Sequence, residues 1–332
     1  MLPTGSTLLN LQLSNQYNGG LLQGTITNII GDSSAGKSFL ALTMLAEASH
    51  NKAFDNYTLY YDDAECANNF NIKELFGNLS KRITSPYKDK GGSDCLESFY
   101  FNLDSILDKN EPFIYILDSM DALTTLSEDD KFDDNKKAFN KGNKIKGSYG
   151  DGKAKINSEC LRKIHDKIEK TNSYLIIVSQ TRDNITDQFI AKTRSGGHAI
   201  KFYSTYEMWM SVGSKIMKPI NDIDRHIGNN VKVKVSKNKA TGCVGILEFP
   251  VNYIFGIDDA DSMIGYLLKE KHFKMSGAYI DNNGIFDKKM YRKEMVIEAY
   301  KGKNLDLLGK ECQKVWDNVQ AQIREGQTGR YK

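Results

Sequence analysis

A glycine-framed segment that ends in lysine and serine is the part of this sequence that most clearly predicts chemistry. Residues 29–39 read IIGDSSAGKSF, which matches the phosphate-loop pattern G-x-x-x-x-G-K-[ST]. In such a loop, backbone N–H groups and the N-terminus of the next helix bind phosphates, the lysine contacts the β- and γ-phosphates, and the serine binds Mg²⁺. The residues predicted to bind a nucleoside triphosphate are Gly31, Asp32, Ser33, Ser34, Ala35, Gly36, Lys37, Ser38 and Phe39.

Three further polar residues follow apolar, strand-like runs. Asp118 ends FIYILD and could orient Mg²⁺, although an aspartate here could also be a helix N-cap. Glu65, in LYYDDAECANNF, could act as a general base toward an attacking water, or could belong to a solvated acidic cluster with Asp62 and Asp63. Gln180 closes YLIIVSQ and could bind a γ-phosphate or be a polar strand end.

The elements that must position these residues alternate between strands and helices. This alternation predicts an α/β fold with a central, mostly parallel sheet. After this sheet, the last two predicted strands could pair as a hairpin. The predicted strands are 25–30, 58–61, 113–117, 174–178, 231–236 and 244–249. The predicted helices are 37–48, 156–168, 260–270, 290–300 and 305–323. The change of pattern near residue 255 predicts a core over 1–255 and a small α+β C-terminal domain over 256–332.

Two stretches are long for loops of a compact core. They are 119–155, which is acidic and then basic and glycine-bearing, and 181–197. Both follow strands of the predicted parallel sheet, where ligands bind beyond the carboxyl ends of the strands. We therefore expect both stretches on the side of the sheet that binds the nucleotide.

Composition excludes several other classes of protein. The chain has 332 residues, a hydrophobic fraction of 40%, a charged fraction of 26% and a net charge of +3, as in an ordinary globular protein. No apolar run is long enough for a membrane span, and the N-terminus does not resemble a secretory signal. Five cysteines without a C-x-x-C pair argue against a disulfide framework and a zinc site, so we expect a cytoplasmic protein. Few prolines and many Lys, Asn and Tyr are typical of an AT-rich genome, such as that of a phage.

Several motifs occur in one order and at spacings that resemble a known family. They are LPTGSTLLNLQL, the phosphate loop, DDAE, ILDSMDALT, SQTR, SGGHAIKFYS and VKVSKNK. In combination they resemble the bacterial RecA recombinases and their phage-encoded, UvsX-type relatives. The resemblance extends from about Leu2 into the C-terminal domain, where LLKEKHFKMSGAYI is also similar. It implies a RecA-type ATPase core that uses ATP and Mg²⁺ and forms an ATP-driven filament on single-stranded DNA.

The resemblance also implies roles for individual residues. Glu65 matches the catalytic base, and Gln180 matches a residue that senses the γ-phosphate and couples it to a second DNA-binding loop at about 181–197. Lys237 and Lys239 of KNK match a pair that reaches the ATP of the neighbouring subunit.

For DNA, the resemblance implies a first loop in the basic part of 119–155, and DNA contacts from the helix that carries Lys155 and Arg162. These two residues are seven apart, so a helix would place them on one face. The alternative to DNA binding is that Lys155 and Arg162 belong to an ordinary solvent-exposed face, on which Glu159 forms an ion pair with either of them. The other residues predicted to bind DNA frame the second loop: Arg182, Arg194, Gly196 and Gly197.

The chain also departs from the family. Only about two dozen residues precede the first core strand, so we expect the family's N-terminal helix and strand, which dock on the next subunit, to be missing. The first loop is longer and more charged than usual, and the acidic C-terminal tail of the family is not found.

The function predicted is an ATP-dependent, single-stranded-DNA-binding recombinase, active in homologous recombination and DNA repair, with double-stranded DNA as second substrate. Further expected partners are other copies of the chain and single-strand-binding or loader proteins. One alternative is an accessory or annealing ATPase with a RecA core that does not exchange strands. The other is a ring helicase or a small-molecule phosphotransferase.

Overall fold

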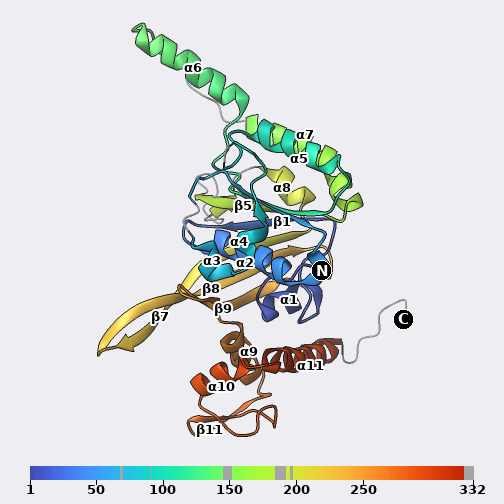
Figure 1. The fold of residues 1–332 in the computed structure, drawn as a ribbon, viewed down its shortest axis with the longest axis vertical. Helices are drawn as coiled ribbons and strands as arrows, with labels where there is room; N and C mark the ends of the chain where they lie inside the picture. Colours follow the sequence, from blue (N-terminus) through green and yellow to red (C-terminus); the bar gives the residue numbers. More distant parts are fainter. Residues whose placement is uncertain (68–69, 90, 145–151, 184–191, 195–196, 325–332) are drawn as a thin grey trace. The chain divides into compact units, whose positions relative to one another are not determined.

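The computed structural model describes residues 1–332 with the exception of 68–69, 90, 145–151, 184–191, 195–196 and 325–332 (Figure 1). Contacts between residues divide the chain into two compact units. Unit 1 consists of 1–21, 212–235 and 240–332, and unit 2 consists of 22–211 and 236–239. The boundary that the sequence predicts near residue 255 stays a prediction.

Unit 2 is built on a mostly parallel sheet, as the sequence predicts. Its strands are ordered β7–β1–β5–β4–β2–β3, and β6 pairs with β5 in antiparallel orientation. Their bounds are β1 (Thr25–Gly31), β2 (Thr58–Asp63), β3 (Ile83–Thr84), β4 (Phe113–Asp118), β5 (Tyr174–Asp183), β6 (Lys192–Arg194) and β7 (Tyr206–Ile220). Residues of β7 from 212 onward belong to unit 1. Every residue of β4 is buried, which explains why this strand reads as a continuous apolar run and not as an alternating one.

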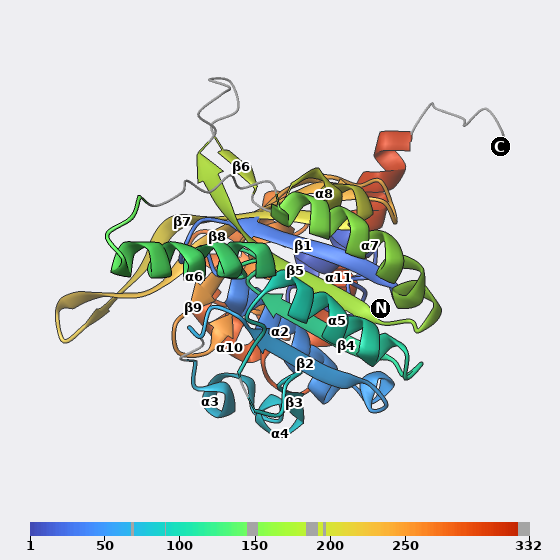
Figure 2. The same ribbon diagram turned by 90° about the horizontal axis from the view of Figure 1, so that it is seen from above.

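Helices cover both faces of this sheet. Figures 1 and 2 show α5, α7 and α8 over one face and α2 over the other. The helices of unit 2 are α2 (Lys37–His50), η1 (Lys52–Phe54), α3 (Ile72–Phe76), α4 (Leu79–Arg82), α5 (Leu96–Leu107), α6 (Leu126–Asn140), α7 (Gly152–Lys170) and α8 (His198–Tyr203). Leu161, Ile164 and Ile168 of α7 lie in the hydrophobic core with Phe99 of α5, which confirms the helical stripe predicted over 156–168.

Helix α6 corrects the prediction that 119–155 is a loop. Thr125 caps the helix, since its side chain accepts a hydrogen bond from the backbone of Glu128, and the Glu128 side chain binds the backbone of Thr125 in return. No residue of α6 is buried, and the helix extends away from the rest of unit 2 in Figure 1. A helix with no buried face has no apolar stripe, so apolar periodicity does not predict it.

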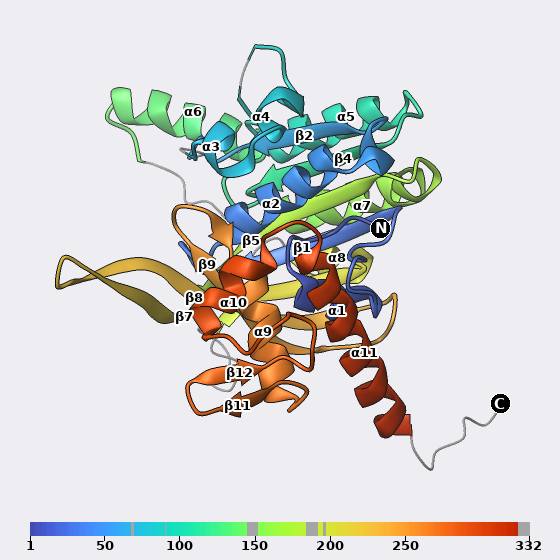
Figure 3. The ribbon, with the colours of Figure 1, turned by 60° about the horizontal axis from the view of Figure 1, so that its bottom comes forward.

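Unit 1 contains the predicted hairpin and the C-terminal helices (Figure 3). Strands β8 and β9 pair in antiparallel orientation with Val233 opposite Leu247, which confirms the hairpin. The elements are α1 (Thr7–Ser14), β8 (Ile223–Asn238), β9 (Gly245–Asn252), β10 (Gly256–Ile257), α9 (Asp259–Lys269), β11 (Lys274–Ser276), β12 (Tyr279–Asp281), α10 (Arg292–Ala299) and α11 (Asn304–Arg324). The last residues of β8, from 236 onward, belong to unit 2. The three helices predicted after residue 255 are confirmed as α9, α10 and α11.

Helix α1, which the sequence analysis did not predict, packs within unit 1. Leu11 lies in the same hydrophobic cluster as Met263 of α9 and Leu308 of α11. The backbone N and the Oγ1 of Thr7 donate hydrogen bonds of 2.8 and 2.7 Å to the carboxylate of Asp259. The N-terminal segment is therefore part of the core of unit 1. That the chain lacks a subunit-docking element stays a prediction.

Among the helices that the structure describes, none is both long and apolar enough to cross a bilayer.

Candidate nucleotide-binding site

The phosphate loop joins β1 to α2, as predicted, and its backbone has the conformation that anion binding requires. Ser34 and Gly36 have positive φ values of 63° and 86°. A Cβ on Gly31 would lie 2.5 Å from the carbonyl oxygen of Met210, so only glycine fits there. Gly36 is the N-cap of α2 and has no side chain to occupy the first-turn N–H groups, which leaves them available to a phosphate.

Lys37 lies buried at the start of α2, with 7% of its surface exposed. Its ammonium donates a hydrogen bond of 2.8 Å to the backbone carbonyl oxygen of Asp32. Burial lowers the pKa of Lys37. Four carboxylates act on this pKa in the opposite direction: Asp118, Glu65, Asp121 and Asp32. A buried ammonium group at the N-terminus of a helix is suited to bind phosphate oxygens.

Asp118 ends β4 beside Asp63 of β2, its partner in the parallel register. Asp118 is 4% exposed, and its carboxylate accepts a hydrogen bond of 2.8 Å from the hydroxyl of Tyr61. Burial raises the pKa of Asp118, and the neighbouring hydroxyls of Ser38 and Tyr61 oppose that shift. The helix that follows is capped by Thr125, so the N-cap interpretation of Asp118 does not hold.

A hydroxyl and a carboxylate side by side are ligands that Mg²⁺ accepts in phosphate-loop enzymes, together with phosphate oxygens and water. Ser38 and Asp118 form such a pair and therefore fit the ion. Within the described residues, no group of three or more His, Cys, Asp or Glu side chains could hold a metal by itself.

Glu65 and Gln180 come from different strand ends and meet in the structure. The Nε2 of Gln180 donates a hydrogen bond of 2.9 Å to the Oε1 of Glu65, and Ser119 donates to the same oxygen. The backbone N of Gln180 donates to Asp121 at 2.6 Å. Sequence reasoning missed Ser119 and Asp121, although they lie one and three residues after Asp118, just past the carboxyl end of β4.

Two side chains of the phosphate loop make contacts beyond the loop. The hydroxyl of Thr181, the residue after Gln180, donates to the carboxylate of Asp32. Phe39 packs against Phe76, with ring centroids 5.3 Å apart. The contact from Thr181 links the phosphate loop directly to the beginning of 181–197.

Lys237 and Lys239 lie at the C-terminal end of α8. Lys237 donates to the carbonyl oxygens of Lys201 and Phe202, and Lys239 donates to that of Phe202 at 3.0 Å. Burial, followed by the charge of Lys239, lowers the pKa of Lys237 to about 8. Two ammonium groups held side by side form a local centre of positive charge. Their role toward a neighbouring subunit stays a prediction.

Of the residues predicted to bind DNA, Lys155 and Arg162 are both exposed on α7. Arg182 lies in β5 opposite Thr193, and Arg194 lies in β6 opposite Thr181, so the backbone places the two arginines on neighbouring strands.

Gly197 is the N-cap of α8, with φ of 80°, and His198 is the first residue of that helix. Gly196 lies outside the described residues, as do 145–151 and 184–191 of the two predicted DNA-binding stretches.

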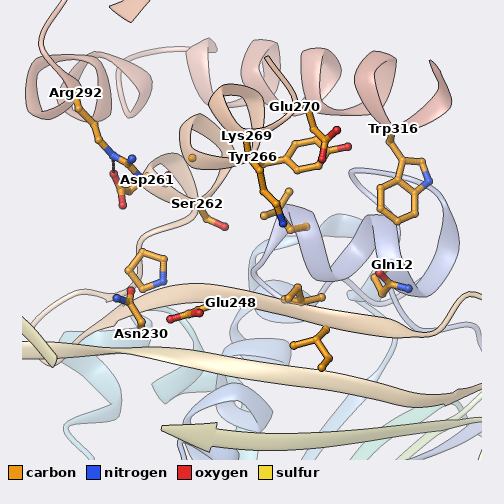
Figure 4. Close-up of a pocket in the computed structure, with 15 residues that line it drawn as sticks. Gln12, Asn230, Glu248, Asp261, Ser262, Tyr266, Lys269, Glu270, Arg292 and Trp316 are labelled. Atoms are coloured by element: carbon orange, nitrogen blue, oxygen red, sulfur yellow. Dashed lines mark hydrogen bonds and ion pairs between the residues drawn. The ribbon is translucent and has the colours of Figure 1, made fainter. Parts of the chain in front are cut away.

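A separate cavity of about 480 Å³ lies within unit 1, and none of the predicted site residues lines it. Residues of α1, β8, β9, α9, α10 and α11 form its walls. In Figure 4, Arg292 pairs with Asp261 at one end, and Trp316 and Gln12 lie at the other. Ser262, which is buried and whose hydroxyl has no hydrogen-bond partner, points from α9 toward β9.

The chain is similar to known proteins over most of its length. The family model of the RecA N-terminal domain matches residues 1–258. The chain is 29% identical to Protein RecA of Nautilia profundicola over 84% of this chain and 72% of the relative. It is 30% identical to Protein RecA of Marinobacter nauticus, over 85% and 73%, and of Delftia acidovorans, over 85% and 69%. With a phosphate loop in place and more than half of its length matched by the family model, the chain belongs to the RecA family.

Proposed function

We propose that this protein is a DNA-dependent ATPase that binds single-stranded DNA and promotes strand pairing and exchange in homologous recombination and DNA repair. The observation that carries this proposal is the hydrogen bond between Gln180 and Glu65, beside the phosphate loop. It joins the predicted general base to the strand that leads into the second predicted DNA-binding stretch. Membership of the RecA family supports the same activity.

ATP is the proposed substrate, and the residues present fit it. The N–H groups of the phosphate loop and the ammonium of Lys37 would bind the β- and γ-phosphates. Ser38 and Asp118 would hold Mg²⁺, which when bound offsets the negative charge of the phosphates. Glu65 would accept a proton from water while the water oxygen bonds to the γ-phosphorus and the bond to ADP breaks.

Coupling to DNA is proposed to run through Gln180. In the structure its amide binds Glu65 and its backbone binds Asp121, so the start of 181–197 is tied to the ATP site. A γ-phosphate offers oxygen acceptors that compete with Glu65 for the same amide. A change of partner at Gln180 would therefore move β5 at the point where it enters this stretch.

The DNA itself is proposed to contact Lys155 and Arg162 of α7, together with residues that frame the second stretch. The latter are Arg182, Arg194, Gly196 and Gly197. Basic side chains bind the phosphate backbone irrespective of sequence, which is what a recombinase requires. Double-stranded DNA would be the second substrate.

Assembly is proposed to complete the ATP site, because Lys237 and Lys239 would reach the nucleotide of the neighbouring subunit in a filament on DNA. Single-strand-binding or loader proteins are proposed as further partners. We place the protein in the cytoplasm, that of a bacterial host if the gene belongs to a phage.

The test is ATP turnover with and without single-stranded DNA. We expect DNA to stimulate turnover several-fold in the wild type, and we expect Lys37→Ala to abolish most ATP binding because it removes the buried ammonium. Equal turnover with and without DNA would reject a DNA-dependent ATPase. Strand exchange between a circular single strand and a homologous duplex then separates a recombinase from an annealing ATPase.

A further inference from the structure

Tyr61 contacts the side chain that is expected to face Mg²⁺. Its hydroxyl donates a hydrogen bond of 2.8 Å to the Oδ2 of Asp118, and both side chains are buried, with 6% and 4% of their surfaces exposed. Tyr61 lies on β2 opposite Ile116, two residues before Asp118 on β4. The two residues therefore stand diagonally on the same face of the sheet, a separation that an aromatic side chain can cross.

In this hydrogen bond the phenolic O–H of Tyr61 is the donor and Oδ2 of Asp118 is the acceptor. The bond therefore fixes the position of one oxygen of the carboxylate.

We propose that Tyr61 is a positioning residue for Mg²⁺–nucleotide binding, because it fixes the carboxylate of Asp118 in the orientation in which that group meets the ion. This inference rests on the proposed function, since it assumes that Asp118 faces Mg²⁺. The Tyr61 hydroxyl on β2 binds one oxygen of Asp118, and Ser38 of α2 lies close enough to influence the same carboxylate. Residues that orient a metal ligand in this way typically contribute 10–100-fold to metal affinity.

A second buried tyrosine on the neighbouring strand supplies a matched control. The hydroxyl of Tyr115 on β4 donates a hydrogen bond of 2.6 Å to Asp62 on β2, and both residues are fully buried. Asp62 also accepts bonds from the backbone N and the hydroxyl of Ser93. Tyr115→Phe thus removes one buried phenol–carboxylate hydrogen bond between the same two strands without touching Asp118.

The experiment measures nucleotide binding by DNA-free protein as a function of Mg²⁺ concentration, with a slowly hydrolysed ATP analogue and titration calorimetry. For Tyr61→Phe we expect the Mg²⁺ concentration at half-saturation to rise about tenfold. Nucleotide binding in excess EDTA should stay at the wild-type level. Tyr115→Phe should keep the wild-type Mg²⁺ dependence, although both variants should lose comparable unfolding free energy in a thermal melt.

Each outcome decides the matter. An unchanged or lower Mg²⁺ requirement in Tyr61→Phe, or an equal rise in Tyr115→Phe, would overturn the role of Tyr61 and leave the proposed function standing. Wild-type protein that binds Mg²⁺–nucleotide but is not stimulated by DNA would overturn the proposed function and leave the role of Tyr61 standing. No Mg²⁺–nucleotide binding by the wild type would overturn both.

Discussion

At the scale of single residues, Glu65 carries the most consequential hydrogen bonds. Its Oε1 accepts hydrogen bonds from both Ser119 and Gln180. Ser119 follows β4, which ends at the proposed Mg²⁺ ligand, and Gln180 lies in β5, which leads into the second predicted DNA-binding stretch. The proposed base is therefore held from both strands. A general base must be positioned as well as basic. These two donors provide the positioning, and exchange of either would alter where the carboxylate points.

Replacement of Glu65 by Gln should separate binding from hydrolysis. The amide keeps the size of the side chain but cannot take a proton from water, so we expect ATP binding close to that of the wild type and hydrolysis about 10²–10⁴-fold slower. Nucleotide binding and phosphate release measure the two effects. Glu74→Gln, an exposed position on α3, is the matched control. Normal hydrolysis by the Glu65→Gln protein would exclude Glu65 as the base.

Lys237 should give the assembled enzyme a pH dependence. With the pKa of this ammonium lowered to about 8, its charge is present below that pH and lost above it. If the charge contacts a neighbour's nucleotide, DNA-stimulated turnover should fall as pH rises through about 8, to about one tenth of its plateau at pH 9.

Lys237→Arg, which stays charged over this range, should remove the fall in the same pH titration. An identical fall in the arginine variant would show that another group titrates.

At the scale of elements, α7 shows most clearly how a prediction from spacing becomes a surface. Leu161 and Ile164 face the core, while Lys155 and Arg162, seven residues apart, are exposed. A helix therefore presents both cations to solvent without any cost to the core.

Charge reversal of both, Lys155→Glu with Arg162→Glu, should weaken single-stranded DNA binding. Each lost phosphate contact should also reduce the slope of log affinity against log salt by about 0.7. Fluorescence anisotropy at several salt concentrations measures both effects. Lys163 and Lys170 are also exposed and seven apart on α7, so Lys163→Glu with Lys170→Glu is the control for net charge. If both double variants lose the same DNA affinity and salt dependence, Lys155 and Arg162 are ordinary solvent-exposed residues and not a specific DNA contact.

Helix α1 should depend on Asp259 for its attachment. Asp259→Ala leaves two donors of Thr7 without their acceptor, which should cost about 1–3 kcal/mol of unfolding free energy. Denaturant unfolding measures this loss, and faster proteolysis within 1–21 should accompany it. Asp306→Ala, which removes an exposed hydrogen bond from Tyr17, should change stability far less. Comparable losses in both variants would argue against a special role for Asp259.

The sequence predicted the elements whose patterns are set by burial. The strands β1, β2, β4 and β5 were found because they are short, continuous apolar runs, and the helix α7 was found because its apolar residues repeat with the helical period. The phosphate loop was found because its spacing is set by chemistry.

The contacts of Tyr61, Ser119 and Asp121 were not predicted, because they depend on the register of neighbouring strands, which a single sequence does not specify. Helix α6 was missed for the opposite reason, since it depends on a cap and not on a core.

At the scale of the whole molecule, the proposed filament requires that one active site draws on two chains. Lys37→Ala subunits keep the Lys237–Lys239 pair, and Lys237→Ala/Lys239→Ala subunits keep the phosphate loop. Mixed on single-stranded DNA, the two inactive proteins should partly restore ATP hydrolysis, because an intact pair can then meet an intact loop. Specific activity of the wild type should also rise with protein concentration. No restoration at any ratio, with wild-type turnover independent of concentration, would mean that each chain contains a complete site.

Helix α6 has a consequence for how the sequence can change over generations. None of its residues is buried, and its start is stabilised locally by Thr125 and Glu128, so substitutions along it leave the hydrophobic core untouched. Selection for folding therefore acts weakly on this helix, and its surface is open to lineage-specific drift. The opposite holds for Gly31, where even one added methyl group would collide with the backbone of β7. Homologous chains should accordingly vary freely along α6 and hardly at all at the position of Gly31.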